Sequence, residues 1–449
     1  MIEFFAIAFR YFAIFYMAYF LWQGVYYVLI ERGRVIKAPK IPITKQKLTI
    51  LFFHIKAILI LAYNHRIGND LALTTLGVGL VWVAFFLIGS LLVKQVYPKG
   101  CPLIWNGYFF LTSISMVVLL RLDPSLAQRQ LLLMLAGFAV MLTLPLVIKG
   151  LPALERLKYV YALGGLALLL AIFYFGSEAF GSLRWLQIGP VGFSPAEVVA
   201  FSYVLFLAAV FRKKRHLAQL ILPSALAVAH VVILVVQRNL GAALIFFMCY
   251  MILMYIGTGS LKLTGLGFGL FAIGSWFAYG QFAHVQVRVS VWWDPWLDVH
   301  GMGYQIIQSF FAMGAGGLFG RGLHMGIPGV IPVVARDMTF AAIAEEFGLI
   351  FSAGLIFVFV MIFYRGVHVA LRCQRKFYAL VAVGFTGVIA FQTFLIIGGT
   401  LNLVPLTGVT VPLISYGGTS LVVTTLMLGV LQWIATYENE EIDAISTEE

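Results

Sequence analysis

Long apolar runs separated by short polar connections constrain the fold of this chain more than any other feature of its sequence. A helix needs about 20 apolar residues to cross the roughly 30 Å hydrocarbon core of a bilayer. About a dozen runs meet this requirement, at residues 2–30, 71–93, 101–120, 130–148, 159–176, 194–211, 217–236, 240–258, 263–283, 340–364, 378–398 and 418–436. The sequence therefore predicts an all-α, multi-pass membrane protein.

The composition supports this fold and argues against a nucleic-acid partner. Hydrophobic residues make up 62% of the chain and charged residues only 11%, which is the range of polytopic membrane proteins. The formal net charge of +12 arises largely from short basic clusters between apolar runs, such as residues 149–158, 212–216 and 365–376. Such clusters mark cytoplasmic loops. Residues 284–339 are then predicted to face outward, and the acidic tail 437–449 to face inward.

The first 100 residues leave one crossing undecided. Residues 48–63 form a short apolar stretch with His54 and Lys56, so they either cross the bilayer or lie on its surface as an amphipathic helix. A crossing keeps the basic linker 32–47 in the cytoplasm and gives thirteen spans, which we favour, whereas a surface helix gives twelve. The N-terminus lacks a basic stretch followed by a small-residue cleavage site, so removal of a signal peptide is not expected.

The predicted outward segment 284–339 is the candidate site of chemistry. It collects charged side chains and nine glycines between Gly301 and Gly329, and it is too long to be a simple turn. ATP and nucleotide sugars are absent outside the cytoplasmic membrane. A reaction in this segment must therefore use a substrate that is already activated, such as a lipid-linked one.

Asp298 is the candidate catalytic residue of this segment. In a glycine-flanked loop at the membrane interface, a carboxylate can stay charged and accept a proton from a sugar hydroxyl. Taken alone, however, the residue suits a turn or a helix cap better. Arg288, Arg321 and Arg336 could each hold a phosphate group through two hydrogen bonds, or could simply be solvated.

Other polar features lie within or beside the apolar runs. Glu346 falls inside the run 340–364, and Glu197 and Arg184 are predicted near the outer face. Buried charge in a span indicates a polar cavity, an ion site or an internal ion pair, and the residues alone leave these alternatives open. The segment 405–420 contains two prolines and three glycines, so it cannot be a regular helix and must line protein or water. It either binds a polar headgroup or is a packed connector.

Several separated stretches resemble the SEDS family of membrane glycosyltransferases, which RodA, FtsW and SpoVE typify. They are RWLQIGPVGFSPAE (184–197), QRNLGAAL (237–244), WDPWLDVHGMGYQIIQSFFAMGAGGLFGRGL (293–323), DMTFAAIAEEFG (337–348) and PLTGVTVPLISYGGTS (405–420). They occur in family order and cover about residues 101–436, the usual ten-span core. Residues 1–100 then form a membrane extension with two or three additional hydrophobic segments.

The resemblance implies a function. Members of this family polymerise lipid II, the undecaprenyl-pyrophosphate-linked disaccharide pentapeptide, into peptidoglycan glycan strands outside the bacterial cytoplasmic membrane. They usually work beside a class B penicillin-binding protein, in cell elongation, division or sporulation. This chain is therefore expected to be an inverting peptidoglycan glycosyltransferase whose partners are lipid II, such a protein and membrane lipid.

The resemblance also assigns candidate residues. The family's essential acidic residue is the second Asp of the pattern D/N-P-x-x-D-P-x-G-x-G-Y, which is Asp298 here. It is expected to act as general base for the attacking hydroxyl or to bind a divalent cation such as Mg or Mn, although no cofactor is required by the pattern. Candidate substrate contacts are Arg288, Arg321, Arg336, Tyr304, Gln305, Gln308, Ser309, Glu346, Arg184, Glu197, Ser415 and Tyr416.

The chain departs from the family pattern at several positions. Val299 replaces the proline after the key Asp, Asn239 replaces a common Asp, and Ala200 replaces a Lys. Two alternatives stay open. A flippase would carry a lipid-linked precursor across the membrane and depend on carboxylates within the bundle. A catalytically silent scaffold would only bind the partners of a cell-wall synthesis complex.

Overall fold

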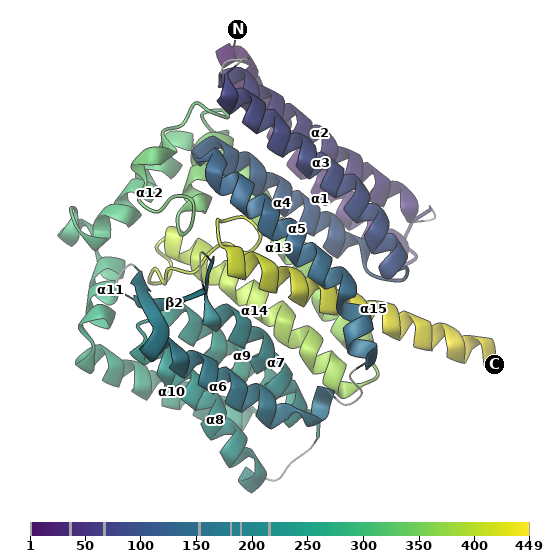
Figure 1. The fold of residues 1–449 in the computed structure, drawn as a ribbon, viewed down its shortest axis with the longest axis vertical. Helices are drawn as coiled ribbons and strands as arrows, with labels where there is room; N and C mark the ends of the chain where they lie inside the picture. Colours follow the sequence, from purple (N-terminus) through teal and green to yellow (C-terminus); the bar gives the residue numbers. More distant parts are fainter. Residues whose placement is uncertain are drawn as a thin grey trace.

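A computed structural model of the chain describes residues 2–35, 38–65, 69–150, 154–179, 182–188, 191–213 and 217–448. Long helices dominate the molecule (Figure 1). Those that correspond to apolar runs are α1 (Ile2–Glu31), α2 (Lys40–Asn64), α3 (Asp70–Val96), α4 (Pro102–Leu122), α5 (Pro124–Gly150), α6 (Lys158–Phe175), α7 (Pro195–Phe211), α8 (Leu217–Val236), α9 (Leu240–Thr258), α10 (Leu261–Gln281), α13 (Thr339–Arg372), α14 (Lys376–Thr400) and α15 (Gly418–Glu448).

The predicted all-α, multi-pass membrane fold is confirmed. Within the part of the chain that the structure describes, twelve helices are long and apolar enough to cross a membrane. The remaining apolar helix, α7, has 17 residues. α2 has 25 residues and packs against α1, α3 and α4. This length fits a crossing, and the total of thirteen spans, which also needs the shorter α7 to cross, stays a prediction.

A three-stranded antiparallel sheet joins α6 to α7 and was not predicted. Its strands are β1 (Gly176–Ala179), β2 (Ser182–Ile188) and β3 (Val191–Phe193), in the spatial order β1-β2-β3. In the sequence, this stretch is only the connection between the apolar runs 159–176 and 194–211. Pairing in a sheet satisfies its backbone N–H and C=O groups. β2 packs against both α6 and α7, so the sheet lies at one end of these helices (Figure 1).

Residues 284–339, predicted as one long loop, contain helices of their own. They are α11 (Ala283–Trp293), the 3-10 turn η2 (Pro295–Asp298), α12 (Met302–Gly316) and a second turn, η3 (Pro328–Val330). Asp294 starts η2, because its Oδ1 accepts a hydrogen bond from the Trp296 backbone N–H at 3.0 Å. Figure 1 shows α10, α11 and α12 along one edge of the molecule. The segment is therefore a mostly helical border rather than an open loop.

α13 is interrupted near its start by Gly348, whose φ of 86° lies in the left-handed region. A Cβ atom at this position would overlap the backbone nitrogen of Gly320, so the two segments approach through glycine. The Leu349 N–H donates to the Gly317 carbonyl at 3.0 Å. The stretch that follows α12, residues 317–327, is thereby fastened to the interruption in α13, and we refer to it as the glycine loop.

The N-terminal helices are attached to α13 near both of its ends. α1 packs along α2 and α13. The rings of Phe9 and Phe53 lie beside the ring of Phe347, with centroids 6.3 and 6.4 Å from it. At the other end of α1, Glu31 accepts hydrogen bonds from Arg365. The extension is thus packed onto the rest of the bundle along most of α1.

Replacing Glu31 by Ala is expected to lower the free energy of unfolding by about 3–5 kcal/mol, because a buried charge would lose its counter-ion. That charge belongs to Arg365, which is only 5% exposed. The measurement is denaturant unfolding of the purified variant. Glu155→Ala removes the partner of Arg212 in a more exposed pair and should cost less than about 1 kcal/mol. Equal losses in the two variants would contradict the prediction.

Candidate active site

A cavity of about 880 Å³ opens inside the helical bundle. Its walls are formed by α5, α7, α9, α11, α12 and α14, together with the three-stranded sheet, residues 333–337 and the irregular segment 405–420. Ile245, Phe246 and Val388 give it an apolar side. The position of 405–420 agrees with the expectation that such a broken stretch lines protein or water rather than lipid.

Charged groups enter the cavity from four parts of the chain. Glu197 comes from the first turn of α7, where the helix dipole favours a negative charge. Arg288 comes from α11 and Arg129 from α5, while Arg336 and Asp337 stand just before α13. The cavity therefore combines three guanidinium groups with two carboxylates.

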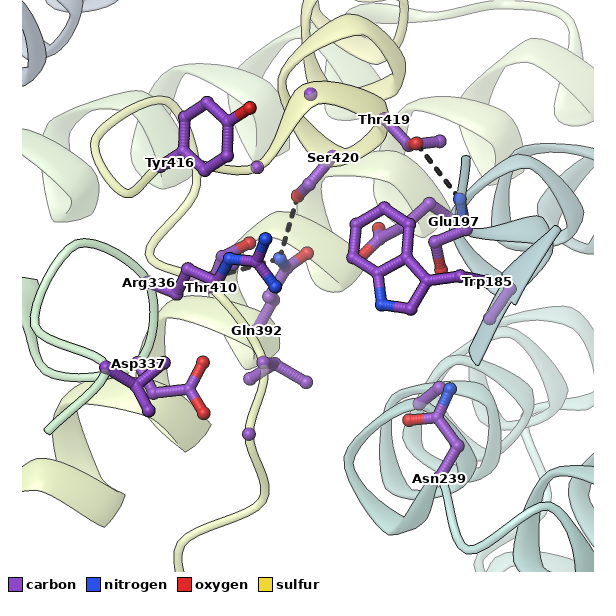
Figure 2. A pocket seen from close by; sticks show the side chains of 18 of the residues that line it. Trp185, Glu197, Asn239, Arg336, Asp337, Gln392, Thr410, Tyr416, Thr419 and Ser420 are labelled. Atoms are coloured by element: carbon purple, nitrogen blue, oxygen red, sulfur yellow. Dashed lines mark hydrogen bonds between the residues drawn. The ribbon is translucent and has the colours of Figure 1, made fainter. Parts of the chain in front are cut away.

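Arg336 is held between two aromatic rings. Its Cζ lies 5.6 Å from the ring centroid of Trp185 and 5.7 Å from that of Tyr416. The Tyr416 N–H donates to the Ala335 carbonyl at 2.7 Å, which ties the ring to the residue before Arg336. Figure 2 shows the guanidinium in the space between the two side chains. Cation–π contacts of this kind orient a planar guanidinium, and a guanidinium so oriented suits two-point binding of phosphate.

Hydrogen bonds hold the neutral wall of the cavity. Gln392 Nε2 donates to the Thr410 carbonyl at 3.1 Å and to the Ser420 hydroxyl at 3.2 Å (Figure 2). The Ser194 N–H donates to Thr419 Oγ1 at 3.0 Å. The segment 405–420 is thereby tied both to α14 and to the residue that precedes α7.

Five of the predicted substrate contacts line this cavity. They are Glu197, Arg288, Gln305, Arg336 and Tyr416. The five residues come from α7, α11, α12, the residues before α13 and the segment 405–420, so the tertiary structure brings together motifs that are far apart in the chain. The side chain of Arg184 lies outside the part of the chain whose side chains the structure describes.

Asp298 is not among the residues that line the cavity. It ends η2 and is exposed. Its carboxylate lies against Gly301, where a Cβ atom would overlap the carboxylate oxygens. The neighbouring Trp296 and Leu297 are also exposed, as expected at a membrane interface. Asp298 therefore stands outside the cavity, shortly before α12, which carries Gln305 into the cavity wall.

Four other predicted residues of α12 and of the segment 405–420 do not line the cavity: Tyr304, Gln308, Ser309 and Ser415. The buried hydroxyl of Ser309 donates to the Thr400 carbonyl of α14 at 3.1 Å. The hydroxyl of Ser415 accepts a hydrogen bond from the Val411 N–H at 3.1 Å. The hydroxyls of these two serines therefore stabilise the backbone next to the cavity through hydrogen bonds.

Glu346 and Arg321 belong to a second cluster of charges. Glu346 is 3% exposed and accepts a hydrogen bond from Arg121 Nε at 2.9 Å. Oε1 of Glu345 lies 3.6 Å from Arg321 Nη1 and accepts a hydrogen bond from the Ile327 N–H at 2.9 Å. None of these five residues is part of the cavity wall. The geometry therefore favours internal pairing, which joins the glycine loop to α13 and α4, over a substrate contact.

Several polar residues of the cavity wall were not among the predicted contacts, among them Arg129, Asn239, Asp337 and Gln392. Asp337 lies two residues before Thr339, the first residue of α13, where an Asp is common for structural reasons, so the sequence alone does not mark it as a cavity residue. Arg129 lies in no recognised motif. The one sequence signal that could have indicated it is its place as a basic residue at the edge of the apolar run 130–148.

A divalent cation remains a prediction. In the described ranges of the chain, no three His, Cys, Asp or Glu side chains gather as metal ligands. The positive charge that the structure does bring together is that of Arg129, Arg288 and Arg336.

Comparison with known proteins relates this arrangement to a family. The family model of the FtsW, RodA and SpoVE cell cycle proteins matches residues 95–440. The chain is 32% identical over 385 residues to peptidoglycan glycosyltransferase RodA of Mycobacterium leprae, which covers 80% of this chain and 83% of that protein. It is 31% identical over 330 residues to the probable peptidoglycan glycosyltransferase FtsW of Bacillus subtilis, which covers 69% of this chain and 81% of that protein.

Solved structures agree with this match. A chain from a peptidoglycan synthase complex that coordinates polymerization and crosslinking is 26% identical, with a TM-score of 0.63 over 74% of this chain and 98% of that one. The rod shape determining protein RodA of Thermus thermophilus shares the fold, with a TM-score of 0.56 at 24% identity over 75% of this chain and 96% of that one. The chain therefore belongs to the family of FtsW, RodA and SpoVE.

Proposed function

We propose that this chain polymerises lipid II into peptidoglycan glycan strands and binds the pyrophosphate end of its substrate in the cavity. It is a multi-pass membrane protein and, as a member of its family, a peptidoglycan glycosyltransferase. The observation that carries the proposal is that Arg288 and Arg336 share the cavity with Glu197, Asp337 and the apolar Phe246. A substrate made of diphosphate, sugar and isoprenoid needs positive, polar and apolar surface in one place.

The reaction needs a base and a place for the departing negative charge. The 4-hydroxyl of the acceptor sugar attacks the anomeric carbon of the donor. A new C–O bond forms while the bond from that carbon to the pyrophosphate oxygen breaks, with inversion. The hydroxyl proton passes to a carboxylate, and the electron pair leaves with the pyrophosphate. Arg288 and Arg336 would stabilise the charge that develops on this group.

Asp298 is the proposed general base. It is exposed, so a sugar hydroxyl can reach its carboxylate. Because α12 follows it and carries Gln305 into the cavity wall, a substrate that extends past α12 would bring its acceptor end to η2. A divalent cation such as Mg or Mn, held by Asp298, is the alternative role for this carboxylate.

The test is glycan-strand synthesis by purified protein from fluorescent lipid II. We expect a ladder of polymers that a muramidase degrades. Loss of the ladder on chelation, with recovery on adding Mg or Mn, would support the cation. Movement of lipid II across a vesicle membrane without polymer would instead support a flippase. Binding of partners with neither reaction would support a scaffold.

A class B penicillin-binding protein is the proposed partner. The similar chain in the solved peptidoglycan synthase complex belongs to an assembly that coordinates polymerization and crosslinking. By analogy, such a partner would crosslink the strands that this chain makes. Co-purification of the two proteins, together with a change in the polymerisation rate when the partner is added, would support the assignment.

A further inference from the structure

The N-terminal extension touches the glycine loop at one end of α1. The family match begins at residue 95, so α1 and α2 lie wholly outside it. Arg10 of α1 donates from Nη1 to the Gly320 carbonyl at 2.7 Å. Gly322 has a φ of 109°, and a Cβ atom there would lie 2.9 Å from the carbonyl oxygen of Ala6. The glycine loop therefore rests against α1 through its own backbone.

The glycine loop also forms hydrogen bonds with the backbone groups of α13 that the interruption leaves without partners inside the helix. The Arg321 N–H donates to the Glu345 carbonyl at 2.9 Å, and the Gly322 N–H donates to the Glu346 carbonyl at 2.9 Å. In an unbroken helix these carbonyls would accept from the N–H groups four residues later, but Leu349 donates to Gly317 at 3.0 Å instead. The loop thus provides the N–H donors for these two carbonyls and the carbonyl acceptor for Leu349. It lies between α1 and α13.

The same loop joins two parts of the cavity wall. Upstream, α12 contributes Gln305, and downstream, the residues before α13 contribute Arg336. At the end of α12, a Cβ atom on Gly316 would overlap the Ala344 carbonyl of α13. Because this approach is so close, a shift of the loop would change how α12 packs on α13. It would also displace η2, which precedes α12 and carries Asp298.

We propose that Arg10 is a positioning residue for the polymerisation reaction. It holds the glycine loop against α13 from the N-terminal extension and thereby keeps α12 and Arg336 in their places. Arg10 itself does not line the cavity, so its effect passes through the loop. A hydrogen bond from a charged guanidinium to a carbonyl is stronger than one between neutral groups, which suits this task. The inference rests on the proposed function.

The test compares Arg10→Ala, Arg10→Lys and Arg32→Ala in the full-length protein. Arg32 is the matched control, since it follows the other end of α1 and donates to the Tyr364 hydroxyl at 2.7 Å. We expect Arg10→Ala to lower kcat for lipid II polymerisation about 10-fold, with KM changed less than about twofold, because catalytic groups lose alignment while binding surface remains. Arg10→Lys should recover most of kcat, since its ammonium group can still donate, and Arg32→Ala should match the parent.

Trypsin cleavage after Arg321 gives a second readout that does not depend on activity. The side chain of Arg321 in the glycine loop is 41% exposed, so release of the loop should speed this cleavage in folded Arg10→Ala protein but not in Arg32→Ala. If Arg10→Ala cannot be purified, Arg10→Gln provides a milder change in the same direction.

Parental kcat and parental cleavage in Arg10→Ala would overturn the proposal. A loss of kcat that Arg10→Lys does not restore would also overturn it. If the parent protein makes no polymer, the proposed function fails, yet the cleavage comparison still decides whether Arg10 holds the loop.

Discussion

Replacing Asp298 by Asn is expected to reduce lipid II polymerisation by about 100- to 10,000-fold. The amide keeps the size of the side chain but cannot take up the proton of the attacking hydroxyl. Because Asp298 is exposed at the end of η2, the change should leave the melting temperature close to that of the parent. The measurement is the initial rate of glycan-strand formation by purified variant, with the folded fraction determined in parallel.

Asp294→Asn is the matched control on the same turn. Oδ1 of Asp294 accepts from the Trp296 N–H at 3.0 Å, and an amide oxygen can accept the same bond. This variant should therefore polymerise at nearly the parental rate. If Asp298→Asn also keeps near-parental activity, the base lies elsewhere. The carboxylates inside the cavity, tested as Glu197→Gln and Asp337→Asn, then become the decisive ones.

Replacing Arg336 by Ala is expected to lower kcat/KM for lipid II by about 100- to 1,000-fold, the usual cost of removing one preorganised donor from a developing negative charge. The rings of Trp185 and Tyr416 orient the guanidinium, with centroids 5.6 and 5.7 Å from its Cζ. Arg336→Lys keeps the charge but loses the planar fork, so it should fall between Ala and the parent. Steady-state kinetics with purified lipid II measure kcat/KM for the parent, for Arg336→Ala and for Arg336→Lys.

Arg375→Ala is the control for Arg336, because Arg375 also lies over an aromatic ring. Its Cζ is 5.2 Å from the ring centroid of Tyr437. It precedes the first residue of α14 and is not part of the cavity wall, whereas Gln392, farther along the same helix, is. Arg375→Ala should polymerise like the parent. A similar loss in both variants would mean that a general effect of arginine removal, rather than phosphate binding, explains the result.

The features that could be predicted from the sequence are those with a local signal. Runs of apolar residues predicted the spanning helices, because a helix that must bury its backbone in lipid needs length and apolar side chains and little else. The sequence could not distinguish the roles of residues of the same type within one segment. Arg321 and Arg336 were both candidate phosphate contacts, yet Arg336 lines the cavity while Arg321 lies 3.6 Å from Glu345 in another cluster.

The chain's residues alone were enough to place the membrane helices and to reveal the family motifs, since both depend on neighbours a few positions apart. Contacts between distant residues settled the rest. Arg10 reaches Gly320 across 310 positions of sequence, and the Ser194 N–H reaches Thr419 across 225. Such pairs form only when whole helices pack, and their geometry reflects the shape of every surface between them. For this reason only the tertiary structure shows the cavity, the hydrogen bonds between the glycine loop and α13, and the position of Asp298 outside the cavity.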